Sequence, residues 1–245
     1  MGVEWGVACG RGDSMDDQGM NRQQAVAQAC RLRVHPAGDM SGLCGRALRG
    51  LQVVPAFDAD GALLLEYRLQ ADLSQLRVPE PAQPRACEGL WQHTCMEAFI
   101  GSGGGDYVEF NFSPSGEWAC YRFAAYRQAL DEPSGGGSPS QSGPVPECST
   151  TCAVDGLHLQ ARIPPGLLPV ASPGGAWVLG LSAVLEGRAG ELAYLALHHP
   201  CARPDFHHHE GFVLRLVPPR DAVVQPRAAR PLQSLQPMPE GSNCL

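Results

Sequence analysis

The sequence contains no lysine, so its 18 basic residues are all arginine, against 25 acidic residues. The resulting net charge of −7 is spread along the chain without basic clusters, which argues against nucleic acid or a membrane surface as a partner. Long apolar runs are also missing. The best one, residues 176–185, is well short of the roughly 18 residues of a membrane span and contains Gly180 and Ser182.

A secretory signal is missing as well, because the first residues have no basic start followed by an apolar core. We therefore expect a cytoplasmic protein, with either Met1 or Met20 as the natural start. Ten cysteines are present, and in a long cytoplasmic chain such residues are more often thiols than a disulfide framework. No two have the Cys-x-x-Cys spacing, and Cys148 and Cys152 lie in a segment expected to be mobile, which is a poor frame for a metal ion.

Glycine and proline are abundant, with 29 and 22 residues, and they divide the chain into short segments. Residues 1–22 and 219–245 show no periodic pattern, so we expect a disordered leader and a disordered tail. Residues 28–218 predict one domain, because 44% of the chain is hydrophobic and can form a sizeable core. Within this domain, the composition of residues 131–150 indicates a flexible insertion.

Short alternating segments bounded by turn residues predict strands, and no long helical period is present. Residues 58–61, Asp-Ala-Asp-Gly, lie between two such segments and are a strong hairpin signal. Outside the central stretch, the expected strands are residues 24–34, 51–57, 62–69, 76–78, 156–163, 176–185, 191–198 and 212–217. This spacing predicts an all-β antiparallel sandwich.

The central stretch, residues 90–127, predicts three further strands at 90–100, 107–113 and 117–123, joined by a glycine turn and a Ser-Pro-Ser-Gly turn. Successive side chains of a strand point to opposite faces of its sheet. One face then carries apolar residues that can fill a core: Met96, Ala98, Ile100, Val108, Phe110 and Phe112. The other carries Trp91, His93, Cys95, Glu97, Tyr107, Glu109, Asn111 and Ser113. This second face is more polar than a buried sheet face normally is.

Alternation alone leaves two choices for the third strand of this stretch. The polar face receives either Trp118, Cys120 and Arg122 or Glu117, Tyr121 and Phe123. We predict the former, because Arg122 then gains Glu97 or Glu109 as a charge partner.

Four stretches carry a resemblance to a known family: LWQHTCMEAFIG, YVEFNFSPSGEWACYRFAAYR, GLSAVLE and HHPCARPDFHHHEGFVLRL. They resemble the bacterial DOMON-like proteins, which are related to family 9 carbohydrate-binding modules, and the match extends over about residues 30–216. The resemblance implies a jelly-roll-like β-sandwich with a concave face, which in characterised relatives holds sugars or haem. It implies no particular substrate, because fold and function are separate claims.

The histidine-rich segments around His198 and His207 contain competent metal ligands, and Asp205 lies among them. They can hold a metal ion, or they can hydrogen-bond and clamp a loop onto the edge of the sandwich. We predict the clamp, which leaves His198 and His207 as weak metal candidates. Haem needs axial ligands such as Met and His, and Met96 falls on the apolar face. We therefore expect no cofactor.

Aromatic rings next to carboxylate and amide groups are the combination that binds sugars, which offer apolar ring faces and paired hydroxyls. We therefore predict a non-catalytic module for a saccharide or another small polar ligand. The predicted site residues are Trp91, His93, Glu97, Glu109, Asn111, Trp118 and Arg122.

Two alternatives stay open. Glu97 and Glu109 on neighbouring strands could form the carboxylate pair of a glycoside-acting enzyme. The polar residues could instead form a buried network that braces the sandwich, because buried polar groups must find partners. A metal-dependent enzyme and a haem-binding DOMON domain are the remaining possibilities, and the sequence does not indicate an oligomeric state.

Overall fold

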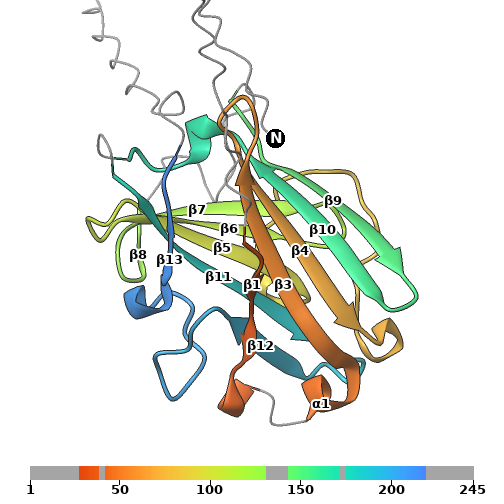
Figure 1. The fold of residues 1–245 in the computed structure, drawn as a ribbon. Helices are drawn as coiled ribbons and strands as arrows, with labels where there is room; N and C mark the ends of the chain where they lie inside the picture. Colours follow the sequence, from red (N-terminus) through yellow and green to blue (C-terminus); the bar gives the residue numbers. More distant parts are fainter. Residues whose placement is uncertain (1–27, 39–41, 131–142, 172–174, 219–245) are drawn as a thin grey trace, which may run out of the picture.

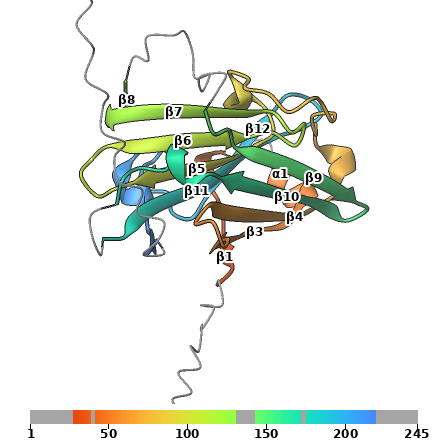
Figure 2. The same ribbon diagram turned by 90° about the horizontal axis from the view of Figure 1, so that it is seen from above.

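The computed structural model describes residues 28–38, 42–130, 143–171 and 175–218. Two antiparallel sheets lie face to face as two layers, which confirms the predicted all-β sandwich (Figures 1 and 2). The expected leader and tail lie outside the described residues. No helix within the described ranges is long and apolar enough to cross a membrane.

The first sheet, sheet A, has the strand order β1-β3-β4-β10-β9. Its strands are β1 (Cys30–Arg31), β3 (Leu48–Phe57), β4 (Leu63–Ala71), β9 (Glu147–Ala153) and β10 (Gly156–Ile163). The predicted hairpin joins β3 to β4, with Gly61 at φ 78°, a backbone conformation that glycine adopts readily. Strand β10 has the bounds that the sequence predicted.

The second sheet, sheet B, has the strand order β2-β12-β11-β5-β6-β7-β8, and β13 pairs with β11 off this path. Its strands are β2 (Arg33–Val34), β5 (Cys95–Gly101), β6 (Tyr107–Phe112), β7 (Trp118–Ala125), β8 (Gln128–Ala129), β11 (Trp177–Glu186), β12 (Leu192–Ala196) and β13 (Leu214–Leu216). Strands β5, β6 and β7 form the meander expected from residues 90–127. Gly116 N donates to Ser113 O (3.0 Å), the hydrogen bond of the expected turn.

Helices are short. The one α-helix in the described residues is α1 (Leu43–Ala47), and the 3₁₀ helices are η1 (Pro36–Gly38), η2 (Leu73–Gln75), η3 (Leu90–Gln92), η4 (Pro165–Leu167) and η5 (His209–Gly211). The structure contains no disulfide among the cysteines that it describes.

The structure corrects four of the predicted elements. The first expected strand is divided at Leu32 into β1 and β2, which belong to different sheets. The start of the strand expected at residues 90–100 is η3 instead, and Leu76 forms only an isolated bridge with Gly187. The expected flexible insertion was wrong at residues 147–150, because β9 begins there and pairs with β10 along its length. Residues 131–142 lie outside the described residues.

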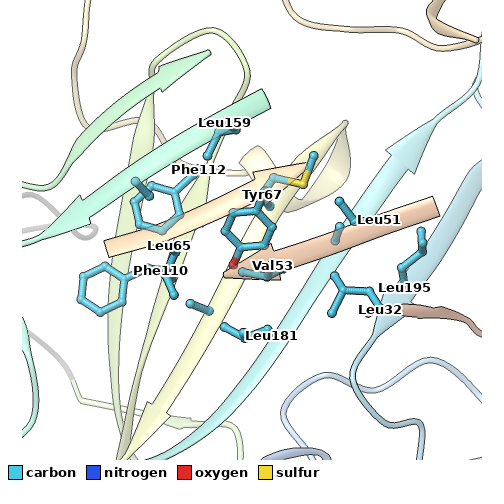
Figure 3. Packing of buried hydrophobic residues seen from close by; sticks show 14 of the residues in the cluster. Leu32, Leu51, Val53, Leu65, Tyr67, Phe110, Phe112, Leu159, Leu181 and Leu195 are labelled. Atoms are coloured by element: carbon cyan, nitrogen blue, oxygen red, sulfur yellow. The ribbon is translucent and has the colours of Figure 1, made fainter. Parts of the chain in front are cut away.

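The core lies between the two sheets and is formed by their inward-facing side chains (Figure 3). All six residues of the predicted apolar face are buried there: Met96, Ala98, Ile100, Val108, Phe110 and Phe112. Tyr67 of β4 is buried among them, and its hydroxyl donates across the sandwich to the backbone carbonyl of Glu97 on β5 (2.8 Å). This hydrogen bond fixes the two layers relative to each other at the position of Glu97.

The pairing of β6 with β7 decides which side chains share the outer face of sheet B, the face turned away from sheet A. Directly opposed residues of antiparallel strands point to the same face. Phe112 opposes Trp118, and Val108 opposes Arg122, so Trp118 and Arg122 point to the inner side. Placing Trp118, Cys120 and Arg122 on the polar face was therefore wrong. Tyr121 opposes Glu109 and occupies that face instead.

Candidate functional site

A cavity of about 450 Å³ lies on the outer face of sheet B, and we call it the outer-face cavity. Its lining comes from strands β5, β6, β7, β11 and β12, from η3, from the turn between β7 and β8, and from the segment between β12 and β13, which is the blue loop between these labels in Figure 1. The lining residues are Trp91, Glu97, Phe99, Glu109, Tyr121, Phe123, Arg127, Val184, Tyr194, Pro204, Phe206 and His207. The lining thus combines aromatic rings with two carboxyl groups.

The two carboxyl groups belong to Glu97 of β5 and Glu109 of β6, which are only 2% and 5% exposed. Glu97 opposes Asn111, two residues along β6 from Glu109, so the two glutamates are diagonal neighbours on the same face. Burial, followed by the nearby Glu109 carboxylate, raises the pKa of Glu97 well above its usual range. Burial raises the pKa of Glu109 to about 7, although the hydrogen bond from Asn111 lowers it.

Neutral side chains position these carboxyl groups. Asn111 Nδ2 donates to Glu109 Oε1 (2.7 Å), and Ser182 Oγ donates to Glu97 Oε2 (3.3 Å). Ser182 reaches Glu97 because it is the residue of β11 directly opposite Glu97 on β5. Cys95 Sγ lies 3.6 Å from Asn111 Oδ1, within the range of a weak thiol hydrogen bond. Each carboxyl group therefore has one oxygen held by the sheet.

The opposite wall of the cavity is built by His207 and its neighbours in the loop between β12 and β13. The Tyr107 hydroxyl lies 2.8 Å from His207 Nδ1 and accepts from the backbone N–H of Arg127 (3.2 Å). This arrangement favours donation from the hydroxyl to Nδ1, which leaves the ring proton on Nε2, 3.7 Å from Glu109 Oε2. Burial, followed by the charge of Arg127, lowers the pKa of His207 to about 4.

Arg127 joins the β7–β8 turn to the same loop. Its Nη2 donates to Asp205 Oδ1 (3.0 Å), and the Tyr126 hydroxyl donates to Asp205 Oδ2 (2.6 Å). Arg127 has φ 52°, in the left-handed region that a non-glycine side chain rarely occupies. Unusual backbone conformations of this kind gather at functional sites, where surrounding contacts hold them in place.

Phe212 packs against the loop side of the site, over a glycine of sheet B. A Cβ added to Gly180 would lie 2.7 Å from Phe212 Cδ1, so this position of β11 has no room for a larger residue. The Phe212 ring also packs on Phe99 and Tyr107, with ring centroids 5.9 Å and 5.5 Å apart. Gly180 thus allows Phe212 to pack directly on the sheet beside the cavity.

A second cavity of about 640 Å³ adjoins the first and shares Trp91 and Tyr121 with it. His93 lines this second cavity and not the first, and its Nδ1 lies 2.8 Å from Glu186 Oε2. Trp91 follows Gly89, whose φ of 73° turns the chain into η3, and its side chain is 51% exposed. Trp91 therefore forms the ridge between the two cavities.

The structure brings together only part of the predicted site. Trp91, Glu97 and Glu109 line the outer-face cavity, and Asn111 supports Glu109 from beneath. Trp118 is only 4% exposed and lies in the core, while the Arg122 guanidinium donates to the backbone carbonyl of Leu167 (3.2 Å) and pairs with neither glutamate. These two residues are not part of the site.

Several lining residues were not predicted: Phe99, Tyr121, Phe123, Arg127, Val184, Tyr194, Pro204 and Phe206. The alternative that the sequence analysis did not choose for the strand at residues 117–123 placed Tyr121 and Phe123 on the polar face. No sequence signal identifies Pro204 or Phe206, because their position depends on how a long loop packs.

The histidine segments hold the loop between β12 and β13 onto the sandwich, as the clamp interpretation predicted. His199 Nε2 lies 2.7 Å from Arg33 O of β2, and His35 Nε2 lies 3.0 Å from Cys201 O. His207 is held by a side chain instead, because its Nδ1 lies 2.8 Å from the Tyr107 hydroxyl of β6. The described residues contain no group of three or more His, Cys, Asp or Glu side chains that could hold a metal ion.

Comparison with solved structures shows a similar fold. The chain is 14% identical to a protein from Bacteroides uniformis described as "a putative carbohydrate-binding protein", over 76% of this chain and 84% of that one, with a TM-score of 0.55. It is 12% identical to a family 9 carbohydrate-binding module from Caldicellulosiruptor kristjanssonii in complex with cellotriose, over 76% and 80% of the two chains, with a TM-score of 0.45. For the same module in complex with glucose, the identity is 13%, the coverage 76% and 82%, and the TM-score 0.40.

The similarity to the Bacteroides protein shows a shared fold. No protein-family model matches the sequence. A comparison with curated proteins found no match either. The relation to DOMON-like proteins stays a prediction.

Proposed function

We propose that this protein is a non-catalytic module that binds a saccharide in the outer-face cavity. The observation that carries the proposal is the lining of that cavity, in which aromatic rings stand next to two buried carboxyl groups. Sugars present apolar ring faces to aromatic side chains and pairs of hydroxyls to carboxylates. The volume of about 450 Å³ lies within the range of ligand pockets, roughly 300 to 1,000 Å³.

Three further observations support the proposal. Each glutamate has one oxygen held by the sheet and a second that carries no hydrogen bond within the described residues, so it can accept from a ligand hydroxyl. The Bacteroides protein that shares the fold is described as a carbohydrate-binding protein. Exposed Trp91 at the mouth of the cavity supplies a platform for a sugar ring.

Calorimetric titration with glucose, cellobiose and cellotriose tests the proposal. We expect saturable binding of at least one of these sugars, and Trp91→Ala should weaken it by about tenfold or more because a ring platform is lost. Val154→Ala, which changes an exposed apolar residue in the turn between β9 and β10, is the control and should bind like the wild type. Unchanged affinity in Trp91→Ala, or no saccharide binding at all, would contradict the proposal.

A glycoside-cleaving enzyme is the second candidate, and one observation favours it. Burial raises the pKa of both Glu97 and Glu109, so one carboxyl group can keep its proton while the other ionises, which is the division of roles in a catalytic carboxylate pair. Chromatography of disaccharides and aryl glycosides incubated with the protein separates the two functions. If the wild type releases cleavage products and neither Glu97→Gln nor Glu109→Gln does, the function is hydrolysis rather than binding.

A further inference from the structure

The outer-face cavity carries negative charge that its own partners do not balance. The one side-chain hydrogen bond to Glu97 comes from the Ser182 hydroxyl, and the short one to Glu109 comes from the Asn111 amide. Both donors are neutral. Within the described residues, no lysine, arginine or protonated histidine forms a hydrogen bond with either carboxyl group.

The two basic residues that line the cavity do not change this balance. The Arg127 guanidinium is paired with Asp205, whose carboxylate offsets its charge. His207 lies 3.7 Å from Glu109, but with a pKa of about 4 it is neutral at pH 7. When one of the two glutamates is ionised, the cavity and its immediate surroundings therefore hold two carboxylates and one guanidinium.

The rest of the lining favours a positive charge over a negative one. Aromatic rings from five segments, η3, β5, β7, β12 and the loop between β12 and β13, line the cavity: Trp91, Phe99, Tyr121, Phe123, Tyr194 and Phe206. A ring face attracts a cation through its quadrupole and offers an anion no comparable stabilisation. A buried carboxylate without a cation is unfavourable, so an occupant that brings one positive charge restores the balance.

The cation that fits is organic rather than metallic. A metal ion needs several ligands arranged around it, and the described residues contain no group of three or more that could supply them. An ammonium group needs only hydrogen-bond acceptors and rings, and the cavity is large enough for the molecule that carries it.

We propose that the outer-face cavity holds an organic ammonium group between Glu97, Glu109 and the surrounding rings, and that the ligand class is an amino sugar. The amino group donates to the carboxyl oxygens of Glu97 and Glu109 that carry no hydrogen bond from the sheet, and the sugar ring packs against Trp91 and its neighbours. The choice of an amino sugar over another organic amine rests on the proposed function.

Binding of a cation depends on the ionisation of the cavity. The titratable and charged groups around it come from β5, β6, β7, β12, the β7–β8 turn and the loop between β12 and β13: Cys95, Glu97, Tyr107, Glu109, Tyr121, Arg127, Tyr194, Asp205 and His207. Of these, Glu109 titrates near neutral pH. Tetramethylammonium keeps its charge at every pH, so a change in its affinity reports on the protein alone, and we expect it to bind more tightly at pH 8 than at pH 5.5.

The test is calorimetric titration of the full chain at pH 7.5 with glucosamine, N-acetylglucosamine, glucose and tetramethylammonium. We expect glucosamine to bind at least tenfold more tightly than glucose and N-acetylglucosamine, because acetylation removes the charge. Glu97→Gln should abolish the preference, and Glu109→Gln is the second variant in case the first fails to fold. Glu66→Gln, which alters an ion pair on sheet A, is the matched control and should keep the preference.

The outcomes separate this inference from the proposed function. Equal affinities for glucosamine and glucose, or a preference that persists in both glutamate variants, would overturn the inference and leave saccharide binding intact. Binding of tetramethylammonium without any of the three sugars would support the ammonium site and overturn saccharide binding. Failure of all four probes would overturn both.

Discussion

Glu97 and Glu109 are buried although an ionised carboxylate is far more stable in water than in a protein interior. Their positions on β5 and β6 are surrounded by side chains that stabilise the sandwich, whereas the two carboxyl groups themselves oppose burial. Groups that cost stability in this way persist where they serve a ligand. At the scale of the residue, the two buried carboxyl groups therefore lower the stability of the fold, which is the cost that the proposed binding site would explain.

The raised pKa of Glu109 predicts a pH-dependent stability. Because the folded-state pKa of about 7 lies above the usual 4.5, the folded protein binds a proton more tightly than the unfolded chain, so this contribution is complete below pH 4.5 and is lost as the pH rises through 7. Relative to the wild type, Glu109→Gln should gain unfolding free energy between pH 5 and pH 8, by up to about 3 kcal/mol. Urea unfolding at several pH values measures the difference.

The pKa of His207 is shifted in the opposite direction, so its effect on stability must be separated from that of Glu109. Its folded-state pKa of about 4 lies below the usual 6.5, so its contribution is present above pH 6.5 and is lost as the pH falls through 4. Comparison of Glu109→Gln with the wild type removes this background, because His207 is common to both. A difference that does not change with pH would show that Glu109 ionises normally in the folded protein.

Sequence alternation identified the two acidic residues of the site and Trp91, but not the other rings around them. Glu97, Glu109 and Asn111 follow from a period of two along strands with a clear apolar face. Arg122 was assigned to the polar face because a charge partner was expected there. Charge pairing is a weaker guide than strand register, because a long arginine side chain can reach partners in many places. In the structure its partner is a backbone carbonyl.

At the scale of the element, the turn between β6 and β7 determines which residues form the site. Ser113 N donates to Glu117 O (2.9 Å), so these two residues are opposed, and the next pair outward is Phe112 with Trp118. A turn one residue longer would reverse every side chain of β7. The length of this turn therefore determines which side chains of β7 point to the outer face. Counting residues from the turn would have placed Tyr121 and Phe123 on that face.

The two faces of β7 predict opposite behaviour for two substitutions. Trp118→Ala should cost about 3 to 5 kcal/mol of unfolding free energy, because the indole ring is buried in the core. Tyr121→Ala should cost less, about 1 to 2 kcal/mol, because its ring is only partly buried, but it should weaken ligand binding about tenfold. Urea unfolding and calorimetric titration with a bound sugar measure the two effects.

Each variant is the control for the other, since both remove an aromatic ring from the same strand. Loss of binding without loss of stability in Trp118→Ala would place the indole ring at the ligand and would contradict the register of β6 and β7.

Strand β9 shows why composition alone misplaced an element. Its residues follow directly on a segment rich in glycine, serine and proline, and most of them are exposed or half-buried because β9 is the edge strand of sheet A. An edge strand needs little apolar character, because only one of its sides pairs and one face is solvated. Its partner is β10, the next strand along the chain, which it meets across the two-residue turn at Val154 and Asp155.

At the scale of the whole molecule, the outer-face cavity depends on a contact between two distant parts of the chain. Asp205 accepts from Tyr126 and Arg127 of the β7–β8 turn and from the backbone N–H of His207 (3.2 Å). Although burial alone would raise it, the hydrogen bonds from Tyr126 and Arg127 lower the pKa of Asp205, so this group is an anion at neutral pH. Asp205 thus holds the loop wall against the sheet wall.

Replacement of this residue tests how the loop is held. Asp205→Asn should speed hydrogen exchange of the His207 amide and weaken ligand binding severalfold, while the unfolding free energy changes by less than about 1 kcal/mol, because the ion pair with Arg127 is half exposed. Glu66→Gln, at an ion pair on sheet A, should change neither exchange nor binding. Unchanged exchange in Asp205→Asn would mean that the other contacts of the loop, such as the packing of Phe206 on Tyr194 and the hydrogen bond of Tyr107 with His207, hold it without Asp205.

The fold as a whole was predictable because a sandwich is specified by many short, repeated signals that agree with one another. The cavity was predictable only in part. Its floor follows the alternation of three strands, whereas its opposite wall comes from a loop whose path is set by individual contacts such as that of Tyr107 with His207. Local patterns do not encode such contacts.

The floor and the loop wall of the cavity differ in how strongly the sandwich depends on them. The floor belongs to strands that also bury Met96, Phe110 and Phe112 in the core, so it can change little without loss of the sandwich. The loop wall contributes His207, Phe206 and Pro204 to the cavity but no strand to either sheet. Evolution can therefore change the sequence of this loop, and with it the ligand that the cavity accepts, while the sandwich stays the same.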